Sequence, residues 1–432
     1  MNVYLSSLGC RVNQSEIETL TRRLAAAGHT IVRDPTQAHI CILNTCAVTA
    51  EAERKTRHMV RYLARTNPQA QIALIGCYVT LRPRESADLP VKWIIPNDQK
   101  VHVVEIATGE NEENGTTHSP FAAIAGMRTR ACVKVQDGCD HHCTYCIVRS
   151  LRGPSRSRPV ADVVAEIQSL VAAGYCEVVL TGVNLGAYGH DLATQDDLVT
   201  LIVALLADTD LPRLRLSSLE AWDIGLDRDG MRLFRLWENA RLCRQLHLPL
   251  QSGCDRILQR MGRRVTTGDF ARIAATARAA IPGLALTTDI IVGFPGEDGG
   301  AFRASYDFVA EMAFARLHVF PYSPRPGTPA TRLPDPVPAA VLAQRAQAMR
   351  DLGTKLSEQF RRQFIGQTLE VLWERQKGTI WSGWSDNYLK VVTHSSLSIS
   401  LHNRITPTHI LCAENAHLVG KVCNPVGVPT DD

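Results

Sequence analysis

VQDGCDHHCTYCIV, residues 135–148, places three cysteines in a C-x3-C-x2-C arrangement, at Cys139, Cys143 and Cys146. The apolar run just before it, Ala131–Val135, is expected to form a strand, so the three thiols belong to the loop that leaves this strand. Three thiolates can hold three irons of a four-iron cluster and leave the fourth iron open, whereas a simple electron carrier normally supplies a fourth cysteine. The spacing therefore predicts an iron-sulfur cluster with a free coordination site.

The same stretch resembles the signature of the radical S-adenosylmethionine superfamily, with Tyr145 as the aromatic residue before the last cysteine. The resemblance implies that S-adenosylmethionine chelates the open iron, and that an electron passed to its sulfonium releases a 5'-deoxyadenosyl radical. Such a radical attacks unactivated carbon-hydrogen bonds. A structural zinc knuckle that uses His141 or His142 as its fourth ligand is the alternative. Its weakness is the position of the triplet, on the first strand of a strand-helix repeat.

The composition is that of a globular protein of more than one domain. At 432 residues the chain exceeds what one core usually organises. A net charge of +4 does not by itself indicate a nucleic-acid partner. The sequence shows no secretory leader or membrane span, which predicts a cytoplasmic protein. Its thirteen cysteines are then expected to serve metal binding or packing rather than disulfides.

The fold is predicted to be α/β, beginning with a parallel-sheet domain over residues 1–107. Short apolar runs alternate there with amphipathic stretches, which is typical of strands joined by helices. One helix is expected at Ser15–Ala27, opened by a capping box of Ser15 and Glu18, and another at Glu51–Arg65. The strands are expected at Val3–Leu8, Ile40–Asn44 and Gln71–Gly76.

A Gly-, Asn- and Glu-rich linker over residues 108–126 separates this domain from a central one over residues 127–360. Six strand-like runs recur in the central region, mostly with helical patterns between them, and predict a partial (β/α)6 barrel. Reactive groups in such barrels sit on the loops that follow the strands. The six runs are Ala131–Val135, Glu177–Thr181, Arg213–Ser217, Gln245–Pro249, Leu284–Val292 and Arg316–Phe320.

Loops after these strands supply further candidate cofactor-binding residues. Glycines there would let the backbone approach a bound cofactor, and polar side chains would meet its ribose or amino groups. Each loop taken singly is more often just a tight turn, but their shared placement favours a site. The candidates are Gly182, Asn184, Gly186, Ser218, Glu220, Gln251, Asp289 and Gly293.

The C-terminal region, residues 366–428, contains five short β-prone runs: TLEVLW, YLKVVT, LSISLH, HILCA and VGKVC. They predict a small five-stranded β-barrel or sheet. Trp381, Trp384, Tyr388 and Lys390 interleave aromatic and basic character, so the last three are candidate RNA-binding residues. Packing of the aromatic rings in the core is an equally open alternative.

Cys10, Cys46 and Cys77 each come just after a predicted strand of the first domain. A βαβ unit takes about 30 residues or more, so three successive strands bring these cysteines to one edge of the sheet. Ligands of open α/β sheets bind at that edge. A second three-cysteine iron-sulfur site is favoured over three unrelated buried thiols.

Motifs over nearly the whole chain resemble a narrower group, the methylthiotransferases. These are LGCRVNQSE, NTCAVTAEAERKTR, GCY, QDGCDHHCTYC, RGPSRSRP, LTGVNLGAYG, HLPLQSG and IVGFPGE. CRVNQ and NTCAVTAEAERKTR look most like the bacterial branch that acts on threonylcarbamoyladenosine beside the tRNA anticodon. The C-terminal strands resemble the small RNA-binding barrel called TRAM. Cys254 departs from the family, which generally has serine there, and is interpreted as a packing thiol.

The resemblance implies two [4Fe-4S] clusters, and S-adenosylmethionine as both methyl donor and radical source. Cluster-bound sulfur would reach carbon 2 of adenine in tRNA, with a flavodoxin- or ferredoxin-type reductant and a sulfur donor as further partners. A sister enzyme acting on isopentenyladenosine, or on an aspartate of a ribosomal protein, is one alternative. A zinc-stabilised RNA-binding module without redox chemistry is the other.

Four arginines follow the cysteine loop and could contact RNA phosphates, although a solvated loop would look the same. They are Arg149, Arg152, Arg156 and Arg158. The histidines form no H-x3-H or HExxH motif, so hydrolytic zinc chemistry has no support. The remaining cysteines lie in or beside apolar runs and are expected to pack: Cys41, Cys132, Cys176, Cys243, Cys412 and Cys423.

Overall fold

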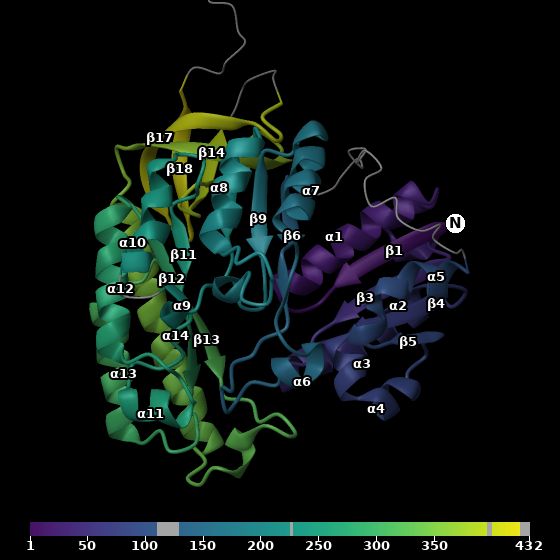
Figure 1. Cartoon of the computed structure of the whole chain (residues 1–432), viewed down its shortest axis with the longest axis horizontal. Helices are drawn as coiled ribbons and strands as arrows, with labels where there is room; N and C mark the ends of the chain where they lie inside the picture. Colours follow the sequence, from purple (N-terminus) through teal and green to yellow (C-terminus); the bar gives the residue numbers. More distant parts are fainter. Residues whose placement is uncertain (110–128, 225–227, 395–399, 424–432) are drawn as a thin grey trace, which may run out of the picture.

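The computed structural model describes residues 1–109, 129–224, 228–394 and 400–423. An N-terminal sheet region, a central half-barrel and a C-terminal barrel follow one another along the chain (Figure 1). The predicted α/β class with a small C-terminal β-barrel is confirmed. Among the helices of these described ranges, none is both long and apolar enough to cross a bilayer.

The N-terminal sheet has five parallel strands in the order β2-β1-β3-β4-β5. Every residue of its central strand β3 is buried, as expected for a parallel strand covered on both faces. The strands are β1 (Asn2–Ser7), β2 (Thr30–Val32), β3 (Ile40–Thr45), β4 (Gln71–Gly76) and β5 (Trp93–Ile95). The helices are α1 (Arg11–Ala26), α2 (Ala50–Thr66), α3 (Cys77–Leu81), α4 (Pro83–Ala87) and α5 (Val103–Thr108).

The predicted capping box of Ser15 and Glu18 is wrong. Helix α1 begins at Arg11, and the amide of Gln14 already donates to the carbonyl of Cys10. Ser15 lies inside the helix and is buried, with its hydroxyl donating to the carbonyl of Val12. The apolar pattern hid the true start because the first turn faces the central domain rather than solvent. Cys10 consequently occupies the N-cap position of α1.

The central region is an open six-stranded barrel. Two three-stranded parallel sheets, β10-β9-β6 and β11-β12-β13, are joined by parallel bridges between Leu214 and Leu242 and between Ser218 and His247. Its strands are β6 (Arg130–Lys134), β9 (Glu177–Thr181), β10 (Arg213–Leu216), β11 (Gln245–His247), β12 (Ala285–Val292) and β13 (Arg316–Pro321), with a small hairpin of β7 (Gln136–Asp137) and β8 (Arg156–Ser157).

Helices cover the outer face of this half-barrel, and helix α1 of the first region lies against β6 (Figure 1). The central helices are α6 (Val148–Arg152), α7 (Val160–Ala172), α8 (Leu198–Asp208), α9 (Ala221–Ile224), α10 (Arg228–Arg235), α11 (Asp255–Arg260), α12 (Thr267–Ala280), α13 (Gly299–Glu311) and α14 (Ala339–Arg362). Short 3-10 turns are η1 (Pro35–Gln37), η2 (Asn97–His102), η3 (Leu185–Ala187), η4 (Leu236–Glu238) and η5 (Pro329–Arg332).

The C-terminal strands close into a barrel in the order β14-β15-β16-β18-β17. One strand was not predicted, β15, because its Ser and Gly residues resemble a turn; it buries Trp381 in the barrel core. The predicted strand LSISLH lies partly outside the described residues, and its last three residues form no strand. The strands are β14 (Thr368–Lys377), β15 (Ile380–Ser385), β16 (Lys390–His394), β17 (Ile405–Glu414) and β18 (His417–Val422).

Buried arginines on β10 fasten this barrel to the start of the central strands. Arg215 is fully buried, donates to Glu177 at 2.7 Å and also donates to the carbonyl of Asp386 at 2.9 Å. Arg213 donates to the carbonyl of Glu370 at 2.6 Å. A charged pair that remains buried needs such hydrogen bonds to offset its desolvation. The C-terminal barrel is therefore held in one orientation against the half-barrel.

Candidate active site

The three scattered cysteines of the first region come together. Cys10 follows β1, Cys46 follows β3 and Cys77 opens α3 after β4, and these three strands are neighbours in the sheet. The thiols are close enough for Cys10 and Cys77 each to shift the pKa of Cys46. All three line one cavity of about 480 Å³. The expected convergence at the carboxyl edge of the sheet is therefore what the structure shows.

Two residues that the sequence analysis did not single out shape this edge. Gly9 has φ +104°, and a Cβ there would lie only 2.8 Å from the sulfur of Cys46, so a larger residue would displace the thiol. Asn13 is fully buried and donates to the carbonyls of Leu8 and Thr45, each at 2.8 Å. Its amide ties the loop after β1 to the loop after β3.

The second triplet lies on the loop between β7 and α6. Cys139 and Cys143 both shift the pKa of Cys146, so these thiols also lie close together. Thr144 fixes the middle of the loop, because its amide donates to the carbonyl of Met261 and its hydroxyl to the carbonyl of Arg260, both at 2.9 Å. The loop is thereby bound to the turn after α11.

Five thiols of the two triplets are protonated near neutral pH. Burial raises the pKa of Cys46 and of Cys146 to about 12 and that of Cys139 to about 11, and it also raises the pKa of Cys10 and Cys143. Iron takes cysteine as thiolate, so cluster binding would release these protons. Each triplet offers three thiol donors. Each donor set therefore suits a cluster with one open iron.

The histidines proposed for a zinc knuckle are engaged elsewhere. The Nε2 atom of His141 lies 2.8 Å from the side-chain nitrogen of Asn184 and 3.1 Å from the indole nitrogen of Trp222. Because both neighbours are donors, Nε2 is an acceptor whose lone pair is already used by these two groups. His142 lies against the guanidinium of Arg149, a cation that disfavours a metal ion beside it. This geometry argues against the zinc alternative.

Several predicted cofactor residues line the two cavities that contain cysteines of the triplets. Tyr145, Gln251 and Asp289 line a cavity of about 170 Å³ together with Cys146. Gly182 and Ser218 line the larger cavity that holds the first triplet. Asp289 lines both cavities, which places it between the two groups of thiols.

Other predicted cofactor residues have supporting roles. Glu220 accepts two bonds from Arg263, at 3.0 and 2.6 Å. Arg263 stacks 4.1 Å over the ring of Trp222 and opposes the burial that raises the pKa of Cys143, although its role was not predicted. Asn184 donates to Asp223 at 2.8 Å.

Two predicted glycines face packed side chains rather than either cavity. A Cβ on Gly186 would lie 2.7 Å from Asp223, and one on Gly293 would lie 2.7 Å from Leu342 of α14. Neither glycine is among the described residues that line the two cavities. The structure shows that both positions need a residue without a side chain for close packing, and their role in cofactor binding stays a prediction.

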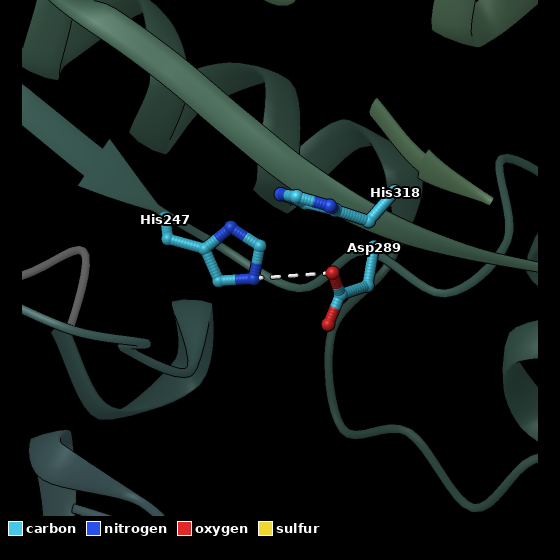
Figure 2. Close-up of side chains that lie close together, drawn as sticks. All are labelled: His247, Asp289 and His318. Atoms are coloured by element: carbon cyan, nitrogen blue, oxygen red, sulfur yellow. Dashed lines mark ion pairs between the residues drawn. The ribbon is translucent and has the colours of Figure 1, made fainter. Parts of the chain in front are cut away.

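A third chemical group lies in the larger cavity and was not recognised from sequence as a unit. His247 on β11, Asp289 on β12 and His318 on β13 converge, as Figure 2 shows. Their ligand-type atoms all lie within 4.8 Å of one another. The Nε2 atom of His247 is 3.3 Å from Asp289, and the two imidazole centroids are 5.7 Å apart. No local spacing could reveal this group, since each member comes from a different strand.

A buried ion network joins the two regions that carry the cysteines. Glu16 of α1 pairs with Lys100 at 2.5 Å, Arg152 at 2.9 Å and Lys134 at 3.1 Å. Burial alone would raise the pKa of Glu16, but the three cations outweigh it and hold that pKa well below its usual value. Arg152 also pairs with Asp137 at 2.9 Å. Arg152, predicted to bind RNA, is thus a buried junction residue, because this network needs its charge.

The other predicted RNA-binding arginines are placed differently from one another. Arg149 is exposed beside His142, whereas Arg158 pairs with Glu166 at 2.6 Å. Arg156 donates to the carbonyl of Arg152 at 2.9 Å. Of this group, Arg149 and Arg156 are exposed and pair with no described carboxylate.

The predicted RNA-binding residues of the C-terminal barrel share one large basic cavity. Trp384, Tyr388 and Lys390 line a volume of about 730 Å³, together with Arg11, Arg33, Arg130 and Arg375. The rings of Trp384 and Tyr388 stack with centroids 4.9 Å apart, and Arg130 lies over both. Arg11 and Tyr388 also line the 480 Å³ cavity of the first cysteine triplet. The basic cavity therefore adjoins the thiol-bearing one.

Two family models match separate parts of the chain, and each part carries one of the cysteine triplets. Residues 2–94 match the model described as Uncharacterized protein family UPF0004, and residues 133–309 match the Radical SAM superfamily. Among solved structures, the radical S-adenosylmethionine methyltransferase TsrM of Kitasatospora setae, with cobalamin and a [4Fe-4S] cluster bound, aligns with a TM-score of 0.55, 17% identity and 76% coverage of each chain. At that identity the likeness concerns the fold alone.

Curated relatives match over most of the chain. It is 37% identical over 400 residues to the threonylcarbamoyladenosine tRNA methylthiotransferase MtaB of Thermotoga maritima, which covers 90% of each protein. It is 35% identical over 392 residues to the tRNA-2-methylthio-N(6)-dimethylallyladenosine synthase of Chloroflexus aurantiacus, with 88% of this chain and 83% of the relative covered. Together with the two thiol triplets, this similarity shows that the chain belongs to the radical S-adenosylmethionine methylthiotransferase family.

Proposed function

We propose that the enzyme adds a methylthio group to carbon 2 of N6-threonylcarbamoyladenosine beside the anticodon of tRNA. The observation that carries the proposal is that thiols of both triplets line two cavities that share Asp289. Cys10, Cys46 and Cys77 line the larger cavity, Cys146 lines the smaller one, and Asp289 borders both. A reaction that moves sulfur onto a carbon activated by a radical needs both reactive groups within reach of the same atom.

Each triplet would hold one [4Fe-4S] cluster, with S-adenosylmethionine on the open iron of the Cys139, Cys143 and Cys146 site. When bound, these groups supply the radical, the methyl group and the sulfur. The protein holds the reactants in place and limits access of water to the small cavity through Tyr145, Ile147 and Ile291. Carbon 2 of adenine carries an inert hydrogen, which is why radical chemistry is required.

The substrate tRNA would enter along the basic cavity of the C-terminal barrel. Trp384 and Tyr388 offer stacking surfaces, and Lys390 and Arg375 offer cations for phosphates. A flavodoxin- or ferredoxin-type reductant and a sulfur donor complete the proposed partners. A reaction on tRNA would take place in the cytoplasm, as expected from the sequence.

Two other substrates within the family remain as second candidates. The similarity to dimethylallyladenosine synthases favours an isopentenyl-type adenosine as the first of these. A ribosomal-protein aspartate is the second, and nothing in the described cavities favours it over a nucleoside. A zinc-bound RNA-binding module is disfavoured by the hydrogen bonds of His141 described above.

Metal analysis and a nucleoside profile test the proposal. Protein purified without oxygen should contain about eight iron and eight sulfide per chain, as expected for two four-iron clusters. Mass spectrometry of tRNA nucleosides from a deletion strain should show loss of the methylthio form of threonylcarbamoyladenosine. Loss of a methylthio-isopentenyl nucleoside instead would show that isopentenyladenosine is the substrate. An unchanged nucleoside profile would show that tRNA is not the substrate. Zinc-loaded, colourless protein would exclude the enzyme altogether.

A further inference from the structure

The last three strands of the half-barrel present an unusually polar inner surface. Alternate residues of a strand face the same side, and those lining the 480 Å³ cavity are Gln245 and His247 of β11, Thr287 and Asp289 of β12, and Arg316 and His318 of β13. The pairs are in register, since His247 lies opposite Thr287, Thr287 opposite Arg316, and Asp289 opposite His318. Barrel interiors are usually filled by branched apolar side chains. This surface is therefore built for a polar ligand.

Two guanidinium groups that line the cavity, one on β13 and one at the start of α1, pair with no carboxylate among the described residues. Arg316 is exposed and makes no ion pair with any described residue, and Arg11 donates to the hydroxyl of Tyr388 at 3.0 Å but pairs with no described carboxylate. Arg152 lines the same cavity but is committed to Glu16 and Asp137. Asp289 is the one described carboxylate that lines the cavity, and it lies 3.3 Å from His247, so the two guanidinium groups leave an excess of positive charge there.

His318 adds a neutral group beside these cations. Burial lowers the pKa of His318 to about 4; Asp289 opposes the shift, while His247, Arg316 and Arg11 add to it. Because the electrostatic effect of a charge weakens with distance, Arg316 and Arg11 both lie near the imidazole ring of His318. A neutral imidazole offers one donor and one acceptor, which suits a ligand that carries both a carboxylate and a hydroxyl.

The tRNA substrates named for the family's relatives differ in just these features. A threonylcarbamoyl group ends in a carboxylate and a hydroxyl, whereas a dimethylallyl group is a hydrocarbon. Overall identity does not separate the two kinds of relative, because both resemble this chain to nearly the same degree. A hydrocarbon in this cavity would desolvate Arg316, Arg11 and His318 without replacing their hydrogen bonds with water. A carboxylate would satisfy the guanidinium groups directly.

We propose that Arg316, Arg11 and His318 form the receptor for the threonyl carboxylate and hydroxyl of the substrate adenosine, and thereby determine which modified adenosine is accepted. This inference rests on the proposed function, whose substrate it specifies. His247 and Asp289 are positioning residues, because their ion pair lies against His318 (Figure 2). The cluster of His247, Asp289 and His318 also has the composition of a divalent metal site. Two unpaired arginines beside it favour an anion over a cation.

The test compares three anticodon stem-loop RNAs of one sequence with the reconstituted holoenzyme. They carry threonylcarbamoyladenosine, its methyl ester, or dimethylallyladenosine at the same position. The wild type should methylthiolate the acid with a kcat/KM about 30-fold or more above that of the ester, since the lost contact is a charged one inside a cavity. It should leave the dimethylallyl RNA nearly untouched. This comparison needs no variant and so does not depend on the folding of one.

Variants then assign the effect to residues. Arg316→Met and His318→Phe should lower kcat/KM for the acid, and the preference for acid over ester should shrink toward one in Arg316→Met. Iron content should stay at the wild-type value in both, which checks that each variant is folded and loaded. Arg303→Met is the matched control, because Arg303 is exposed on α13 and lines neither cavity.

Equal rates on acid and ester with the wild type would overturn the receptor while leaving the proposed function intact. An equal loss on both RNAs in Arg316→Met would also overturn it. If the wild type modifies only the dimethylallyl RNA, or neither RNA, the proposed function fails and the receptor fails with it. One equivalent of a non-iron divalent metal that Asp289→Asn loses would assign the cluster to a cation and overturn the anion receptor.

Discussion

The two cysteine triplets reach similar arrangements by opposite routes. Cys139, Cys143 and Cys146 lie within eight residues on one loop, so their proximity is a property of the local chain. Cys10, Cys46 and Cys77 come from three loops, and they meet because β1, β3 and β4 are parallel neighbours in the sheet. The loop triplet depends on its loop, whereas the sheet-edge triplet depends on an intact domain.

This difference teaches where each site is vulnerable. The loop triplet is tied to the turn after α11 by the bonds of Thr144. The sheet-edge triplet is tied by Asn13, and its position relative to the loop triplet is set by the ion network around Glu16 and Arg152. Damage to the loop should remove radical formation itself. Damage at the sheet edge or the junction should instead separate radical formation from sulfur transfer.

The largest expected effect comes from single cysteine substitutions, which should distinguish the roles of the two triplets. Cys143→Ala should abolish both 5'-deoxyadenosine and methylthio product, because the radical cluster loses a ligand. Cys46→Ala should abolish the methylthio product but keep 5'-deoxyadenosine formation. Each variant should lose about half of the iron. The assays are iron analysis and mass spectrometry of both products.

Cys41→Ala is the control for this pair, because Cys41 is a fully buried thiol of β3 that lines neither cavity. It should retain the full iron content. If Cys46→Ala and Cys143→Ala lost the same products, the division of labour between the two triplets would be wrong.

The next effect concerns the ion network of Glu16 and Arg152, which joins the N-terminal sheet region to the central half-barrel. Arg152→Ala removes one of the three cations paired with Glu16 and leaves Asp137 with Lys134 alone. Breaking a buried pair costs up to about 3–5 kcal/mol. The midpoint of thermal unfolding should fall, and less methylthio product should form for each 5'-deoxyadenosine released. Arg149→Ala, three residues earlier and exposed, should change stability by less than about 0.5 kcal/mol. Equal effects of the two substitutions would show that the network does not align the triplets.

A smaller effect should appear as a pH dependence of the same junction. The pKa of Glu16 is well below its ordinary value of 4.5 in the folded state, so its stabilising contribution is fully present above about pH 4.5. It is lost as the pH falls from there toward the folded pKa. Thermal unfolding between pH 7 and pH 3 should show this loss as a fall in the unfolding midpoint. Glu16→Gln should start less stable and show a flatter acid limb; an unchanged slope would contradict the assignment.

The smallest effect concerns the basic cavity of the C-terminal barrel, where the tRNA is proposed to bind. Lys390→Gln should weaken tRNA binding by a few fold and reduce the slope of log affinity against log salt by about 1, as expected for one lost phosphate contact. Lys377→Gln is the control, since Lys377 is exposed at the end of β14 and does not line the basic cavity. A matching loss in both variants would point to general charge attraction rather than a defined path.

The amino-acid sequence by itself determined the α/β class and the cysteine loop, because strand periodicity and C-x3-C-x2-C spacing are local properties. It also located Cys10, Cys46 and Cys77, since topology rules turn successive strands into one sheet edge. It misplaced the start of α1 and missed β15, because Ser15 and the Ser and Gly residues of β15 have local preferences that tertiary packing overrides.

Only the tertiary structure decided which charged side chains are exposed and which are buried in ion pairs. Arg149 and Arg152 are neighbours in one basic run, yet one is exposed and the other is buried against Glu16. His247, Asp289 and His318 share no motif and become a group because strand register places them on one inner surface. Burial and pairing depend on side chains distant in sequence, so no pattern along the chain can reveal them.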